Sequence, residues 1–132
     1  MKLNKEQLVD LLCTATFGCD WLECACLKSE KHLDEQFSQE YLDNRCCEEK
    51  WADRLLAGGT LVCIDYEDDN ENGKPKRYKL TIKDFEERLQ EAPFCDDECV
   101  VRSFCNWRIE NYDYYDCNNL LQYVMFGEVV YG

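Results

Sequence analysis

Apolar residues recur along much of the chain at the spacing of an amphipathic helix. The first such segment begins after Asn4, a typical N-cap residue with Gln7 three positions later, and it ends before Gly18. Its apolar residues share one helical face: Leu8, Leu11, Leu12 and Ala15. The pattern therefore predicts a first helix between Asn4 and Gly18.

A second helical segment ends in the sequence LLAGG, whose two glycines supply the left-handed conformation that often ends a helix. It begins near Asp43 or as early as Ser38. Residues 60–66 then alternate as a β-strand does, and residues 77–80 are predicted to return beside them after the polar turn DDNENGKP. A β-hairpin is therefore expected in the middle of the chain.

Three more helices are predicted after the hairpin. The first covers residues 81–90, because Thr81 and Asp84 form a capping-box pair at its start. The others cover residues 97–109 and 113–126, and a glycine closes the last. The expected fold class is therefore α+β, with four to five helices packed on a small antiparallel β-hairpin in a single domain of residues 1–132. The stretches 19–40 and 67–77 are expected to be the loosest.

The chain holds 11 cysteines, a density that fits a disulfide scaffold, a metal site or the use of cysteine as a small apolar residue. Its N-terminus, MKLNKEQLVDLL, places charged residues where a signal peptide needs apolar ones, so a cytoplasmic protein with reduced thiols is expected. Cysteines on apolar stripes then belong to the core. These are Cys47, Cys63 and Cys117.

A zinc site is the alternative use of the cysteines. The candidate ligands are Cys24, Cys26, Cys95, Cys99 and Cys105. Their C-x-C and C-x3-C spacings differ from the paired C-x2-C pattern of structural zinc sites, and three acidic residues lie between Cys95 and Cys99. We therefore predict no metal or other cofactor and keep a zinc-binding regulatory module as the alternative.

Catalytic and calcium motifs are incomplete. Residues 68–73 match the first half of an EF-hand loop, but the twelfth position is Lys79 instead of glutamate, and the flanks are predicted strands. His32 is the single histidine and lies in a charged stretch. Because no complete set of acid, base and nucleophile is present, we predict a protein that is not an enzyme.

Charge is the sequence feature that says most about partners. Acidic residues outnumber basic ones 28 to 15, which gives a net charge of −13. Such a field repels nucleic acids and anionic membranes and attracts basic clefts. The alternative interpretation is that the charge serves solubility alone. We predict a partner-binding surface made of Glu35, Glu40, Asp43, Asp65, Glu67, Asp68, Asp69, Glu71, Asp96, Asp97 and Glu98.

Four segments resemble a family of small acidic proteins encoded by tailed phages and prophages. They are LVDLLCTATFG, WADRLLAGGTLVCIDYED, LTIKDFEERLQ and CNNLLQYVMFGEVVYG. The most specific part is the closing pattern L-Q-x-x-x-F-G-E-V-V-Y-G over residues 121–132, whereas residues 19–47 and 95–105 lie outside the resemblance. The resemblance implies a genomic setting and no catalytic residue.

Small acidic phage accessory proteins often inhibit host systems, including CRISPR nucleases, and many resemble nucleic acid in charge. The resemblance therefore implies a protein that acts in the cytoplasm of a bacterial host and blocks a nucleic-acid-handling defence protein there. The expected partner has a basic nucleic-acid-binding cleft, as a CRISPR effector does, and no direct binding to nucleic acid or membrane is expected. The alternatives are the zinc-binding module and a phage takeover adaptor without charge mimicry.

Overall fold

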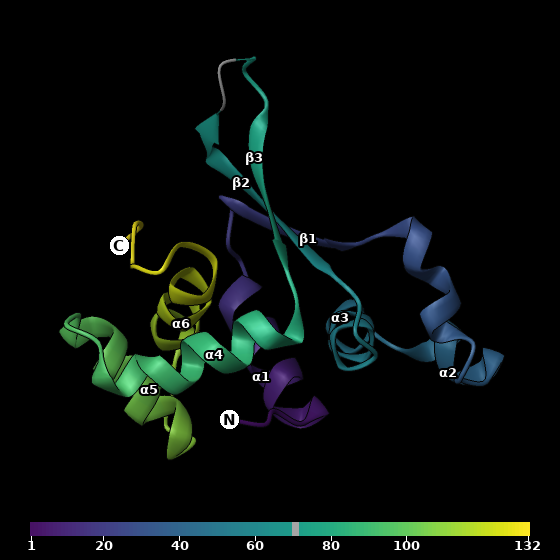
Figure 1. Cartoon of the computed structure of the whole chain (residues 1–132), viewed down its shortest axis with the longest axis horizontal. Helices are drawn as coiled ribbons and strands as arrows, with labels where there is room; N and C mark the ends of the chain where they lie inside the picture. Colours follow the sequence, from purple (N-terminus) through teal and green to yellow (C-terminus); the bar gives the residue numbers. More distant parts are fainter. Residues whose placement is uncertain (70–71) are drawn as a thin grey trace.

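The computed structural model describes residues 1–69 and 72–132, and it shows an α+β protein, as predicted (Figure 1). The elements follow in the order α1 (Lys5–Thr16), β1 (Leu22–Cys26), the 3-10 helix η1 (Lys28–Asp34), α2 (Gln39–Asn44), α3 (Cys47–Leu56), β2 (Leu61–Asp69), β3 (Pro75–Leu80), α4 (Ile82–Glu91), the 3-10 helix η2 (Ala92–Phe94), α5 (Glu98–Arg108) and α6 (Tyr114–Phe126).

Local capping chemistry sets the starts of the helices, as the sequence predicts. The Asn4 carboxamide oxygen accepts a hydrogen bond from the Gln7 backbone N–H at 2.8 Å, and the Gln7 side chain accepts one from the Asn4 N–H at 3.0 Å. At α4 the Asp84 carboxylate accepts from both the N–H and the hydroxyl of Thr81. Such caps satisfy backbone donors that the first helical turn leaves unpaired.

The predicted second helix is divided into α2 and α3. Arg45 and Cys46 have extended backbone conformations, and a new capping box between Cys46 and Glu49 starts α3. The described residues therefore hold six α-helices instead of the four to five expected. The prediction was wrong here because apolar residues continue at helical spacing across the break. The helix itself is interrupted there by the extended backbone of Arg45 and Cys46.

The sheet has a third strand that the sequence analysis did not predict. Its order is β1-β2-β3, and both pairs are antiparallel. β1 lies inside the stretch 19–40, which was expected to be loose, and Cys24 pairs directly with Cys63 of β2. The expected hairpin is present as β2 and β3, with an irregular register between Asp65 and Asp69.

The core draws on most elements of the chain. Its fully buried side chains include Leu8 of α1, Leu61 of β2, Phe85 of α4 and Leu121 of α6. Burial of this apolar surface is the main favourable contribution to folding. The core therefore fixes the central helices against one another and against the sheet.

Two of the three cysteines predicted to be core residues are buried. Cys63 and Cys117 are 0% exposed, as expected, whereas Cys47 is exposed. The prediction for Cys47 was wrong because α3 begins at this residue, and the side chains that α3 buries start at Ala52. Cys47 therefore stands at the helix end, outside the core.

The buried side-chain amide of Gln122 binds the C-terminal residues to α6. The Gln122 side-chain oxygen accepts from the N–H groups of Val130 and Tyr131 at 2.8 Å each, and its nitrogen donates to the Tyr131 carbonyl at 2.9 Å. The Tyr131 hydroxyl donates to Asp65 at 2.8 Å, and its ring centroid lies 4.6 Å from that of Trp21. Residues of the closing sequence pattern thus have structural roles in this chain.

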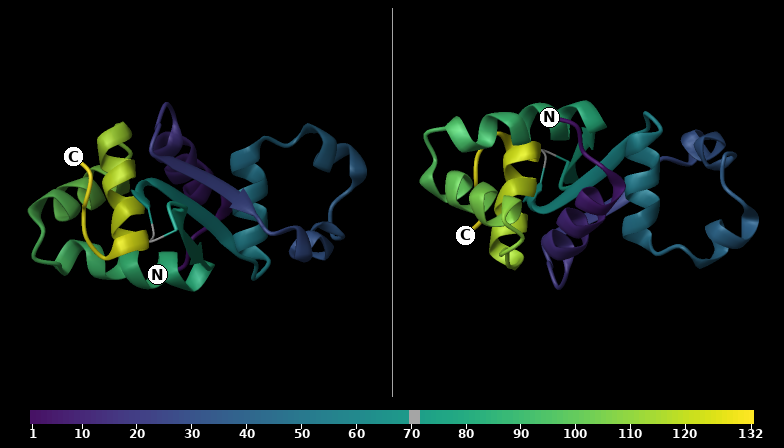
Figure 2. Two further views of the ribbon diagram at one scale, coloured as in Figure 1. Left: turned by 90° about the horizontal axis from the view of Figure 1, so that it is seen from above. Right: turned by 90° about the horizontal axis from the view of Figure 1, so that it is seen from below.

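The chain between β1 and α3 extends away from the other helices. In Figure 2 this segment, which contains η1 and α2, lies at the opposite end of the molecule from α5. Within the part of the chain that the structure describes, we find no helix with the length and apolar character needed to span a membrane.

Candidate functional site

We call residues 28–46, which contain η1 and α2, the arm. The arm projects from the helical body at the far side of α3 (Figure 2). No residue of α2 is buried, so this helix is not held by an apolar face. Its attachment therefore depends on polar contacts with α1 and α3.

A buried ion pair fixes η1 to α3. The Arg54 guanidinium donates from Nε and Nη2 to the two Asp34 carboxylate oxygens at 2.9 Å each, and its Nη1 donates to the Leu27 carbonyl at 3.1 Å. Arg45 Nη2 lies 2.8 Å from Asp34 Oδ2. Two-pronged pairs of this kind combine charge with a fixed orientation. The side chains of these three charged residues are almost fully buried.

A second carboxylate joins the arm to α1. Asp53 Oδ2 accepts from the Tyr41 hydroxyl at 2.7 Å and from Arg45 Nη1 at 3.1 Å, and Lys5 Nζ lies 3.1 Å from Asp53 Oδ1. Lys5 also donates to the Tyr41 hydroxyl. We call Lys5, Asp34, Tyr41, Arg45, Asp53 and Arg54 the arm cluster.

The arm cluster keeps Asp34 ionised. Hydrogen bonds from Arg54, and then from Arg45, lower the pKa of Asp34 to about 2, although burial opposes this shift. The Asp34 bonds raise the pKa of Arg54 in turn. Three cations and two carboxylates are paired inside the arm cluster, and the exposed Glu35, Glu40 and Asp43 take no part in these pairs.

The start of the arm also contacts the segment that follows α3. The Glu30 carboxylate accepts from the Thr60 backbone N–H at 2.8 Å. Gly59 is packed so closely that a Cβ there would lie 2.8 Å from the Arg54 carbonyl oxygen and from Leu33 Cδ1. Only glycine fits this position without a shift of the backbone. The sequence LLAGG therefore ends α3 and also allows the arm to pack closely against it.

Three predicted surface acids lie on the arm. Glu35, Glu40 and Asp43 are exposed, as expected. Glu35 and Asp43 help to line a hollow of about 550 Å³ whose apolar lining comes from Phe37 and Leu42. The remaining lining residues are Lys31, His32, Asp34 and Gln39. The lining of the hollow therefore combines an apolar surface with carboxylates and with the cationic Lys31.

The acids of the hairpin are arranged differently. Asp65 is 1% exposed and accepts from Tyr131 and from the Glu67 N–H, so it is a structural residue instead of part of the exposed surface. Glu67 is exposed, and Asp68 lies 3.4 Å from Lys76 of β3. The Asp69 side chain and Glu71 lie outside the described residues.

The third acidic group lies at the start of α5. Asp97 is the N-cap, and its carboxylate accepts from the Cys99 N–H at 2.9 Å, while Asp96 and Glu98 are exposed. Acids are favourable at a helix N-terminus because of the helix dipole. These residues therefore have a structural use apart from any partner.

The five cysteines considered as zinc ligands are divided between two parts of the fold. Cys24 and Cys26 are on β1, whereas Cys99 and Cys105 are on α5 and Cys95 precedes it. Across residues 1–69 and 72–132 we find no group of three or more cysteine, histidine or acidic side chains placed to hold a metal ion. The structure therefore does not bring the candidate ligands together.

Excess chelator is accordingly expected to leave the protein folded. A structural zinc ion would contribute directly to folding free energy, so its removal would unfold the chain. The measurement is the thermal midpoint and helical circular dichroism of freshly purified protein, with and without EDTA. Unfolding by EDTA, together with about one zinc per chain beforehand, would contradict this expectation.

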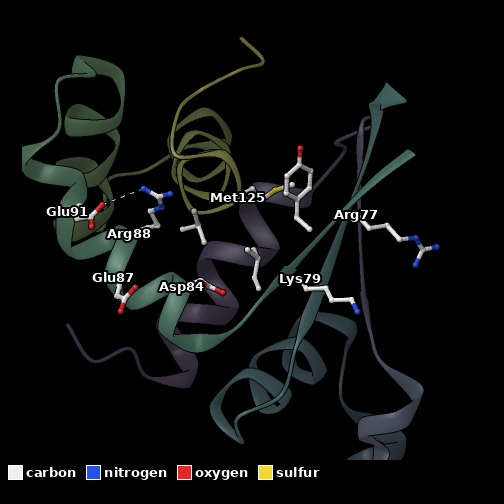
Figure 3. A pocket seen from close by; sticks show the side chains of 10 residues that line it. Arg77, Lys79, Asp84, Glu87, Arg88, Glu91 and Met125 are labelled. Carbon is white, nitrogen blue, oxygen red and sulfur yellow. Dashed lines mark ion pairs between the residues drawn. The ribbon is translucent and has the colours of Figure 1, made fainter. Parts of the chain in front are cut away.

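A hollow of about 610 Å³ lies between β3, α4 and α6, and Figure 3 shows Arg77 and Lys79 on one side and Glu87, Arg88 and Glu91 on the other. Its described lining contains no cysteine, serine or histidine. The calcium-like stretch 68–73 begins within the last two residues of β2 and is followed by β3, and residues 70–71 lie outside the described residues.

No family model, curated protein or solved structure matches this chain. The resemblance to phage proteins and the function it implies therefore stay hypotheses. The geometry of the arm is the structural observation on which a functional proposal can rest.

Sequence reasoning missed the arm cluster. The sequence analysis singled out neither Asp34 nor Asp53, although both are buried. One available signal is that Arg45 and Arg54 are the only two arginines before Arg77, and both lie in an acid-rich stretch. Arginine is the residue best suited to buried pairs with carboxylates.

Proposed function

We propose that this protein is a phage-type acidic accessory protein that binds and inhibits a host nucleic-acid-handling defence protein, as an anti-CRISPR inhibitor does. It would act in the bacterial cytoplasm and take the place of nucleic acid in a basic cleft of its partner. The observation that carries the proposal is the arm, a projecting segment fixed by buried ion pairs that presents Glu35, Glu40 and Asp43 to solvent.

The arm suits this role better than the other acidic groups do. On the hairpin, the four bases of residues 74–79 lie close in sequence to Glu67 and Asp68 and offset their charge. At α5, Asp97 is already used as a helix cap. The arm combines exposed carboxylates with a rigid attachment, and rigidity reduces the entropy lost on binding.

The hollow of the arm fits the side chains that nucleic-acid-binding clefts carry. Such clefts are rich in arginine and lysine, which bind phosphates. The stem of an arginine could pack on Phe37 and Leu42 while its guanidinium reaches the carboxylates of Glu35 and Asp43. The chain's net charge of −13 also exceeds the magnitude of roughly 2–8 that keeps a small domain soluble.

Expression of the protein in a bacterium that carries a CRISPR or restriction system is expected to restore plating of a phage that the system targets. Changing Glu35, Glu40 and Asp43 together to lysine should abolish this effect, because the arm would then repel a basic cleft. The thermal midpoint of the purified variant should change little, since the three side chains are exposed.

The matched control changes Asp20, Glu87 and Glu128 to lysine, which gives the same change in net charge at exposed acids outside the arm. The control variant should still restore plating. Equal loss in both variants would assign the effect to net charge instead of the arm. Full activity of the arm variant would contradict charge mimicry and favour a takeover adaptor that binds by other contacts.

A further inference from the structure

Two cysteine side chains meet across the strands β1 and β2. Cys24 and Cys63 are directly opposite in the register, and their Sγ atoms lie 3.7 Å apart. The Tyr66 N–H donates to the Trp21 carbonyl at 2.8 Å, which makes these two residues a hydrogen-bonded pair one step beyond the start of the ladder. Because hydrogen-bonded and non-hydrogen-bonded pairs alternate in antiparallel sheets, Cys24 and Cys63 form a non-hydrogen-bonded pair.

This position permits a disulfide without movement of the strands. Non-hydrogen-bonded pairs have Cα atoms about 4.5 Å apart, and disulfides accept Cα separations of about 4.4–6.8 Å. The two sulfur atoms are already in contact, so rotation of the side chains with a small adjustment of the pair is enough to bring them to bonding distance. The sheet therefore positions the two thiols for disulfide formation.

The two thiols differ in access to solvent. Cys24 is half-buried on β1, the edge strand of the sheet, whereas Cys63 is 0% exposed. The pKa of the Cys63 thiol lies well above its ordinary value because it shares a hydrogen bond with Cys24 and is buried. A dissolved oxidant can therefore reach Cys24 and not Cys63 in the folded protein.

We infer that Cys24 and Cys63 form a covalent modification site, at which a small-molecule disulfide such as glutathione disulfide converts the two thiols into a cross-strand disulfide. The inference rests on the sheet alone and is independent of the proposed partner of the arm.

The reaction proceeds by two thiol–disulfide exchanges. The Cys24 thiolate attacks one sulfur of glutathione disulfide, which forms a mixed disulfide at Cys24 and releases one glutathione. Cys63 then loses its proton, and its sulfur attacks Cys24 Sγ, which forms the Cys24–Cys63 bond and releases the second glutathione. The protein gives up two electrons and two protons, and these reduce one glutathione disulfide to two glutathione molecules.

The disulfide would close a loop that contains the whole arm. Cys24 and Cys63 are 39 positions apart, and η1, α2 and α3 lie between them. Closing a loop of this length restricts the unfolded chain and stabilises the fold. The oxidised protein should therefore have a thermal midpoint higher by several degrees, and it should hold β1 against β2 more firmly.

The test uses the full-length reduced protein incubated with glutathione disulfide. Free thiols are then blocked with N-ethylmaleimide in denaturant, and the protein is examined by intact mass and peptide mapping. We expect a species that has lost two hydrogen atoms and carries a peptide link between Cys24 and Cys63. A matched Cys105→Ala variant, which lacks an exposed thiol outside the pair, should form the same link.

Two single variants separate the steps. In Cys63→Ala the glutathione adduct on Cys24 should persist, because the second thiol is missing. In Cys24→Ala the Cys63 thiol should stay free in the native protein. The inference is overturned if the wild-type adduct on Cys24 persists as it does in Cys63→Ala, or if the wild-type link joins other cysteines. The wild-type peptide map decides this even if a variant fails to fold.

Discussion

Replacing Arg54 with methionine is expected to destabilise the protein by about 3 kcal/mol, because it leaves the Asp34 carboxylate with one cationic partner in a buried site. It also removes the donor to the Leu27 carbonyl. The measurements are the free energy of unfolding in urea and amide hydrogen exchange across η1 and α2, since the arm can loosen locally before the core unfolds.

The matched control is Lys83→Met, which removes a surface ion pair with Glu87 whose atoms are 3.7 Å apart and whose side chains are mostly exposed. This change should cost no more than about 0.5 kcal/mol. Similar small effects in the two variants would show that the arm cluster does not hold the arm.

The same ion pair makes stability depend on pH in the acid range. The pKa of Asp34 is lowered to about 2 in the folded protein, whereas an unfolded aspartate has a pKa near 3.9. Its contribution of up to about 2 kcal/mol is therefore fully present above about pH 5 and is lost as the pH falls toward 2. In Asp34→Asn this part of the acid dependence should disappear, as unfolding measured across pH 2–6 would show.

Replacing Cys117 with aspartate is expected to destabilise the fold by more than about 4 kcal/mol, because it puts an unpaired charge into the core. Cys117 is 0% exposed, and burial together with the nearby charge of Asp116 raises the pKa of its thiol to about 12. An aspartate there would have a raised pKa for the same reasons. The destabilisation should therefore grow as the pH rises above about 4, where the unfolded aspartate ionises.

Two comparison variants define this effect. Cys117→Ala removes the thiol without adding charge and should cost much less. Cys105→Asp places the same charge at an exposed position on α5 and should change stability by less than about 0.5 kcal/mol. Denaturant unfolding of the three variants at pH 4 and pH 7 provides the measurement, and a Cys117→Asp protein as stable as Cys117→Ala would contradict the core assignment.

The parts of the fold that the sequence predicted are those with strong local signals. Asn4 with Gln7 and Thr81 with Asp84 locate the starts of α1 and α4, because capping needs only neighbouring residues. The strand β1 was missed because its sequence LECAC is short and mixes a charged residue with small ones, which gives no clear strand pattern. Its pairing with β2 stabilises the extended conformation instead.

The candidate site was predicted less well than the fold. The exposure of Glu35, Glu40 and Asp43 follows from their polar surroundings, and the sequence predicted it. The burial of Asp34 and Asp53 depends on arginines that only the tertiary fold brings to them, so a pattern that treats every acid as exposed cannot find it. The sequence therefore predicted the charge of the arm and not what holds it in place.

The proposed function is tested most directly by the association rate of the protein with a purified partner, measured over a series of salt concentrations with and without the partner's guide or target strand. We expect association to slow as salt rises, to slow further when Glu35, Glu40 and Asp43 are reversed in charge, and to be blocked by the competing strand. A second variant, in which Glu67, Asp68 and Asp69 of the hairpin are reversed in charge, should slow association less. Binding that is indifferent to salt, to both reversals and to nucleic acid would contradict charge mimicry and would direct attention to exposed apolar residues such as Tyr115, which is 65% exposed.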